Sequence, residues 1–104
     1  MRHAIAHDLS LELAQKTARA ACEHYKQRFA KYEPSIVWQG DERAEVSFRA
    51  KGLSIRGKVD VAPASLVVDI DVPFLLRPFQ GRAVEIVERE LNRWIAKAKA
   101  GEIT

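Results

Sequence analysis

The chain contains one cysteine and one methionine, and it has no long apolar run. One cysteine cannot form an internal disulfide, which agrees with a reducing compartment. No uninterrupted apolar segment approaches the roughly 20 residues that a membrane-spanning helix needs. The first ten residues also lack the apolar core of a secretory signal. From these absences we expect a cytoplasmic protein without a membrane span.

The sequence also lacks the short motifs of common catalytic sites: a Gly-rich phosphate loop, Cys-x-x-Cys, Gly-x-Ser-x-Gly and His-Glu-x-x-His. Cys22 and His24 lie two positions apart on a predicted helix and point in nearly opposite directions, so Cys22 is expected to be an inert thiol that is buried or half-buried. His3 and His7 would stand about 13 Å apart on a strand, too far to share a metal ion, which favours a surface or capping role. We therefore expect no catalytic residue, no metal site, no cofactor and no enzyme activity.

Length and composition favour one domain that spans residues 1–104, because 104 residues with 47% hydrophobic content can form one core. The net charge of +3 and the isoelectric point near 9.2 are mildly basic. Such a balance allows weak attraction to anionic surfaces without indicating a dedicated nucleic-acid patch.

An amphipathic helix is predicted over residues 10–32. Ser10 can cap its first amides, and Pro34 disfavours helical geometry at Glu33. Apolar residues recur at steps of three and four and define its buried face: Ala14, Ala18, Ala21, Tyr25, Phe29 and Tyr32.

A second helix is predicted to begin between residues 78 and 82 and to end before Gly101. Its core stripe is Val84, Val87, Leu91, Trp94, Ile95 and Ala98. Arg82, Arg89 and Arg93 lie on the opposite side and could contact anionic groups. Glutamates are mixed among them and no aromatic residues are interleaved, which argues against nucleic acid as the partner.

Between the helices, alternation with period two predicts strands over 44–50, 53–61 and 66–72. A two-residue loop at 51–52 and a four-residue loop at 62–65 specify the register. The predicted partners are Phe48–Ile55, Ser47–Arg56, Glu45–Lys58, Lys58–Asp69 and Arg56–Asp71. Opposite charges therefore meet along one face, which explains Asp69 and Asp71 better than a carboxylate site does.

Two further strands complete the expected sheet, one at 36–38 and an edge strand at 3–6. The length of the turn after Gly40 leaves it open whether Val37 or Trp38 faces the core. The order β-α-β-β-β-β-α predicts an α+β fold, a two-layer sandwich in which both helices cover one face of an antiparallel meander.

The segment VPFLLRPFQGR places Phe74, Leu75, Leu76 and Phe79 in a connection, where bulky apolar side chains must fold onto the core or contact a partner. Ile86 falls about 130° from the centre of the core stripe, and Phe79 falls beside it. Either the first helix or the turn covers these side chains, or they form an apolar patch for a partner.

Three elements together resemble the polyhydroxyalkanoic acid system protein family, also called the granule-region family: the HDLSLELA start, the WQGD turn and FLLRPFQGR. The most specific parts are 74–76 and the Pro78-Phe79-x-Gly81 motif. The resemblance implies a role in bacterial polyester storage, with a polyhydroxyalkanoate granule surface or a granule-associated protein as partner. It supplies no catalytic residues.

Three functions are compatible with these observations. The first is a non-catalytic module that binds a granule through the apolar patch, with the arginines at its rim. The second is a carrier in which the sheet and the C-terminal helix grip an apolar ligand such as an acyl chain, an analogy with helix-grip folds. The third is a regulator that acts through nucleic acid or another protein.

Overall fold

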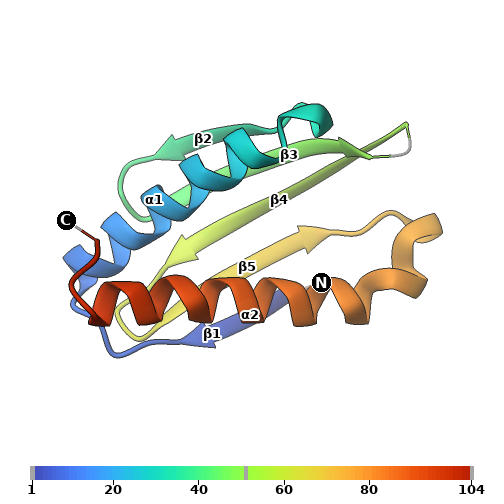
Figure 1. The fold of residues 1–104 in the computed structure, drawn as a ribbon. Coiled ribbons are helices and arrows are strands. Elements are labelled where there is room, and N and C mark those ends of the chain that lie inside the picture. The colour runs from blue at the N-terminus through green and yellow to red at the C-terminus, as the bar shows by residue number, and fades with distance from the viewer. Residues whose placement is uncertain (1, 51, 104) are drawn as a thin grey trace.

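The computed structural model describes residues 2–50 and 52–103 and contains one five-stranded antiparallel sheet covered on one face by two helices (Figure 1). The elements in chain order are β1 (Arg2–Ala6), α1 (Leu11–Arg28), the 3-10 helix η1 (Ala30–Tyr32), β2 (Ser35–Gln39), β3 (Arg43–Ala50), β4 (Leu53–Val61), β5 (Ser65–Asp71), the 3-10 helix η2 (Phe74–Phe79) and α2 (Gln80–Lys99). The strands lie side by side in the order β1-β5-β4-β3-β2. The predicted α+β class and element order are confirmed, including the edge strand β1.

The predicted register is confirmed at every pair. Phe48 pairs with Ile55, Ser47 with Arg56, Glu45 with Lys58, Lys58 with Asp69, and Arg56 with Asp71. These charged side chains lie on the uncovered face of the sheet. Among the described residues of this face, the cross-strand ion pair within 4 Å is that of Arg43 and Asp60, at 2.6 Å. The other opposite charges are neighbours without close contact, since long exposed side chains gain little from one fixed geometry in water.

The strand turns settle what the pattern left open. Trp38 pairs with Ala44 on the covered face and is half-buried, whereas Val37 faces away and is 55% exposed. Ala50 pairs with Leu53, which leaves two residues for the predicted 51–52 loop. Lys51 lies outside the described residues, and Gly52 adopts a φ of +76°, a conformation typical of glycine.

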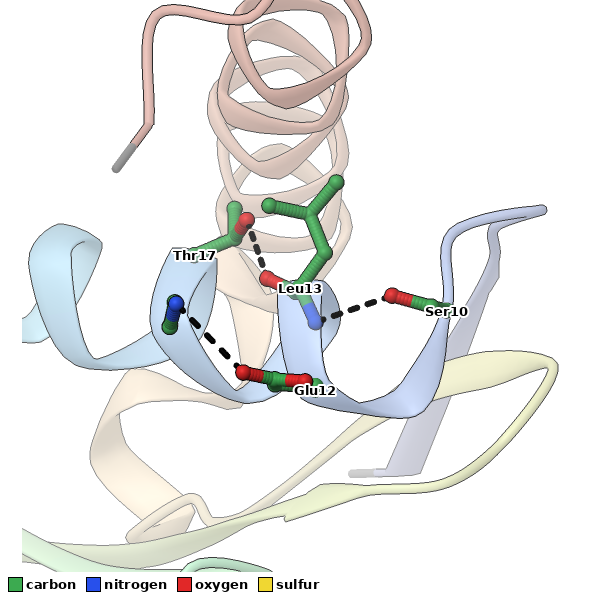
Figure 2. A network of polar contacts seen from close by, with 5 residues as sticks. Ser10, Glu12, Leu13 and Thr17 are labelled. Carbon is green, nitrogen blue, oxygen red and sulfur yellow. Dashed lines mark hydrogen bonds and ion pairs between the residues drawn. The ribbon is translucent and has the colours of Figure 1, made fainter.

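The first helix begins as predicted. Leu13 N–H donates to the Ser10 hydroxyl at 3.1 Å, and the Thr17 hydroxyl donates to the Leu13 carbonyl at 2.7 Å (Figure 2). The second bond satisfies a hydroxyl that is buried in the core. Lys16 and Glu12 form an ion pair at 3.5 Å on the exposed side.

The predicted C-terminus of this helix is wrong by four residues, because α1 ends at Arg28 and not at residue 32. Phe29 leaves helical geometry, η1 follows, and Glu33 takes the left-handed conformation with a φ of 52°. Pro34 makes a right-handed helical conformation at Glu33 unfavourable, and β2 begins directly afterwards. The chain therefore turns earlier than its apolar periodicity suggests.

Burial is concentrated at one end of the molecule, which we call the closed end. The buried residues of α1 lie between Ala14 and Ala21, and those of α2 lie in its last turns. They form one cluster with strand residues: Ile5, Leu9, Ala14, Ala18, Val61, Leu66, Ile95 and Ala98. At the opposite end, where α1 ends and η1 and η2 lie, the helices are separated more widely in Figure 1. We call this the open end.

Gly57 allows β4 and β5 to approach closely in the middle of the sheet. A Cβ atom at this position would lie 2.8 Å from the Asp69 carbonyl oxygen and 3.1 Å from Cγ1 of Ile70. We expect Gly57→Ala to lower the free energy of unfolding by about 1–3 kcal/mol, as other overpacked sites do. Urea unfolding followed by circular dichroism measures this.

The matched control is Gly81→Ala in α2, where a Cβ atom would meet nothing within 4 Å. This variant should change the free energy of unfolding by no more than about 1 kcal/mol, in the stabilising direction. Equal stability of Gly57→Ala and the unmodified chain would contradict the close approach.

Candidate functional site

Four of the five residues predicted to form an apolar patch are exposed. The exposed fractions are 78% for Phe74, 70% for Leu75, 58% for Phe79 and 42% for Ile86, while Leu76 is half-buried. They lie on η2 and the first turns of α2, at the open end (Figure 1). We call Phe74, Leu75, Leu76, Phe79 and Ile86 the η2 patch.

The 3-10 geometry of η2 determines which of these side chains lie on the same side of the turn. Residues three apart share a side of a 3-10 helix, so Phe74 lies on the side of Arg77 and Leu76 on that of Phe79. The Arg77 guanidinium stands 5.9 Å from the Phe74 ring centre, and Leu76 N–H donates to the Pro73 carbonyl at 2.9 Å. The turn is therefore ordered by its own contacts while Phe74 and Leu75 project into solvent.

The three arginines predicted at the rim are all exposed on α2. Arg82 and Arg89 line a shallow hollow together with Ile86, so the structure brings cations beside this member of the η2 patch. Arg93 lies one turn further along and contacts Glu90 at 3.8 Å. Glu85 also lines this hollow, so Ile86 is an apolar side chain among charged ones of both signs.

A second apolar site, which the sequence patterns missed, lies between the end of α1 and the sheet. It is a groove with a volume of about 540 Å³. Its lining residues are Tyr25, Lys26, Phe29, Tyr32, Pro34, Ile36, Val46 and Phe48. We call it the aromatic groove. The periodicity placed Tyr25, Phe29 and Tyr32 on a buried helix face, but Phe29 is 41% exposed.

Aromatic contacts form one wall of this groove. Tyr25 and Phe29 stack with ring centres 6.0 Å apart, and Phe29 and Tyr32 are 6.2 Å apart. The break after Arg28 makes this arrangement possible, because η1 redirects the chain before Tyr32. A signal for the groove was present in the sequence as aromatic residues running up to a proline, yet the same spacing also describes a core.

The apolar floor of the groove continues across the sheet. A smaller hollow of about 70 Å³ shares Val46 and Phe48 with the groove and extends over β4 and β5 to Ile70. Gly57 lies within this hollow and contributes no side chain to fill it. Apolar surface therefore runs from the aromatic groove to β5, the strand that precedes η2.

The two helices are joined where the open end begins. Trp94 Nε1 donates to the Tyr25 hydroxyl at 3.1 Å, and the His24 ring lies against both, at 5.1 Å from Tyr25 and 5.5 Å from Trp94. Burial raises the pKa of the Tyr25 hydroxyl, which keeps it neutral. These contacts hold the Tyr25 ring in place as part of the groove wall.

The two histidines considered as possible metal ligands, His3 and His7, make contacts within the fold instead. His7 is buried and not on the surface: its Nε2 lies 2.9 Å from the Ala62 carbonyl oxygen and its Nδ1 accepts from Leu9 N–H at 3.2 Å. It thereby caps the turn before α1, and His3 lies 3.5 Å from Glu88. Within residues 2–50 and 52–103, no three His, Cys, Asp or Glu side chains gather closely enough to hold a metal ion.

Comparison with known proteins identifies a family. The sequence model of the family described as "putative polyhydroxyalkanoic acid system protein" matches residues 3–95. No curated protein and no solved structure matches the chain. In the described part of the chain, no helix combines the length and apolar character needed to cross a bilayer.

Cys22 is half-buried on α1, and burial raises the pKa of its thiol to about 11. At pH 8 only about one thiol in a thousand is then a reactive thiolate. We expect iodoacetamide to modify the folded protein at least about a hundredfold more slowly than the urea-unfolded protein at this pH. Mass spectrometry of timed samples measures both rates.

The pH dependence of the modification rate tests whether burial of the Cys22 thiol is the cause of its slow reaction. In the folded protein the rate should keep rising above pH 9, with circular dichroism confirming that the fold persists at each pH. A rate that levels off near pH 8.5, as for an exposed thiol, would show that burial does not control this cysteine.

Proposed function

Because the chain belongs to the family of polyhydroxyalkanoic acid system proteins, we propose that it is a non-catalytic cytoplasmic protein that binds polyhydroxyalkanoate granules through the η2 patch. The family description links the chain to the polyhydroxyalkanoate system. Its direct partner would be the granule surface or a protein on that surface.

The observation that carries this proposal is the exposure of Phe74 and Leu75 on consecutive positions of an ordered turn. Large side chains that project into water leave a favourable hydrophobic contribution unused until a partner covers them. Burying them contributes about 25 cal/mol per Å² of apolar surface. A storage polyester offers the apolar counterpart.

The arginines on α2 support binding through the η2 patch. Arg82, Glu85 and Arg89 line one hollow with Ile86, so a surface that covers Ile86 meets two guanidinium groups and one carboxylate at the rim of the contact. Charged groups at a rim affect the rate and orientation of binding more than the affinity. They would contact anionic groups at the granule boundary.

The aromatic groove favours a second candidate function, that of a carrier for a hydrophobic ligand such as an acyl chain. Its volume of about 540 Å³ falls within the range of about 300–1,000 Å³ that is common for small-molecule sites. This groove lies between α1 and the strands β2 and β3, and so differs from the position between sheet and C-terminal helix that the helix-grip analogy suggests.

Sedimentation with polyhydroxyalkanoate granules tests the first proposal. The unmodified chain should pellet with granules, and the double variant Phe74→Ser, Leu75→Ser should bind at least about tenfold more weakly, because each side chain contributes about 1.5–3 kcal/mol when buried. Both side chains are exposed, so the melting temperature should change little.

Val37→Ser is the matched control, since Val37 is also exposed but lies on the uncovered sheet face. It should pellet like the unmodified chain. Granules stripped of protein distinguish the partners: binding to them indicates the polymer, and binding only to native granules indicates a granule protein. Absence of the unmodified chain from both pellets would refute the proposal.

A further inference from the structure

The aromatic groove combines apolar walls with a positively charged edge. Seven of its eight lining residues are apolar or aromatic, and the charged one is Lys26. Two more cations lie on its aromatic residues: Arg28 stands 5.5 Å from the Phe29 ring centre and Lys31 stands 5.1 Å from that of Tyr32. Lys26 is thus the cation that lines the groove, and Arg28 and Lys31 lie against rings of its aromatic wall.

The carboxylates of this region do not pair with Lys26 or Lys31. Glu33 is the one acidic residue within positions 25–34, against three basic residues. Arg28 contacts Glu90 at 3.9 Å, whereas in the described part of the chain no carboxylate lies within 4 Å of Lys26 or Lys31. The ammonium group of Lys26, which lines the groove, is therefore available to an anion.

The groove is also preformed. Tyr25 is held by Trp94 and stacks on Phe29, and η1 contacts β3 before the left-handed turn at Glu33 leads into β2. A site whose walls are held by contacts of the protein loses less entropy when a ligand enters. Its apolar floor continues over Val46 and Phe48, which gives an extended chain room to follow the sheet.

We propose that the aromatic groove binds a single-chain alkyl carboxylate, with the alkyl chain between the aromatic wall and the sheet and the carboxylate at Lys26. Charge complementarity selects this occupant, because a carboxylate at the groove can pair with the Lys26 ammonium group and a neutral chain cannot. The inference rests on the carrier candidate above, and it does not depend on granule binding by the η2 patch.

Calorimetric titration with decanoate below its micelle concentration tests this inference. We expect saturable binding at one site in the unmodified chain, and at least about tenfold weaker binding of the neutral analogue decanol. A fatty acid and a hydroxyalkanoic acid both present the required chemistry, so 3-hydroxydecanoate is titrated in parallel. The tighter of the two identifies the source of the natural chain.

Two variants locate the site. Lys26→Met keeps most of the length of the side chain and removes its charge, so it should weaken decanoate binding about fivefold and leave decanol unaffected. Lys16→Met, on the same helix and away from the groove, is the matched control and should bind decanoate like the unmodified chain. Phe29→Ala removes the middle of the aromatic wall and should weaken both ligands at least about tenfold.

The outcomes separate this inference from the granule proposal. Phe74→Ser, Leu75→Ser should bind decanoate normally, and Lys26→Met should pellet with granules normally. Absence of saturable decanoate binding, equal affinity for decanol, or unchanged affinity in Phe29→Ala would overturn the inference. A thermal melt of each variant confirms that it is folded before titration.

Discussion

The close contact of α1 and α2 over the sheet at the closed end is the constraint on which the rest of the structure depends. Small residues make it possible: Ala14, Ala18 and Ala98 are almost fully buried and let the helices approach the strands and each other. Along α1 the side chains of this face then grow from alanine to tyrosine, and Phe29 follows directly after the helix. Larger side chains need more space, so the layers that meet at one end separate at the other.

This gradient of side-chain size explains why both candidate sites lie at the open end. The aromatic groove forms where the bulky end of α1 can no longer reach the sheet, and the η2 patch forms where the chain must return from β5 to α2. The contact between Trp94 and Tyr25 lies at the boundary between the closed end and the open end. One packing gradient therefore produces a stable core and an accessible apolar surface within the same small chain.

Much of this fold was predictable from the sequence because two independent patterns agree. Alternation of apolar residues and pairing of opposite charges both specify the register of β3, β4 and β5, so a one-residue slip would violate both. The end of α1 was not predictable in the same way. The spacing of Tyr25 and Phe29 is identical whether the side chains enter a core or line a groove, and only the tertiary structure distinguishes them.

The two candidate sites also differ in whether they could be identified from the sequence. Ile86 could be identified from the sequence because an apolar residue among arginines violates the local pattern of an amphipathic helix. The aromatic groove violates no local pattern, and it requires residues from α1, η1, β2 and β3 that become neighbours only after folding. The periodicity of apolar residues describes one helix or strand at a time, so it does not identify a site that is assembled from four elements.

The division into two ends also affects what substitutions can reveal. The buried cluster of the closed end holds the layers together, whereas Phe74, Leu75 and Phe29 keep much of their surface in water. A substitution at an exposed position removes few contacts of the folded state and therefore changes stability little. Loss of binding at the open end can thus be separated from loss of folding, because different residues carry the two properties.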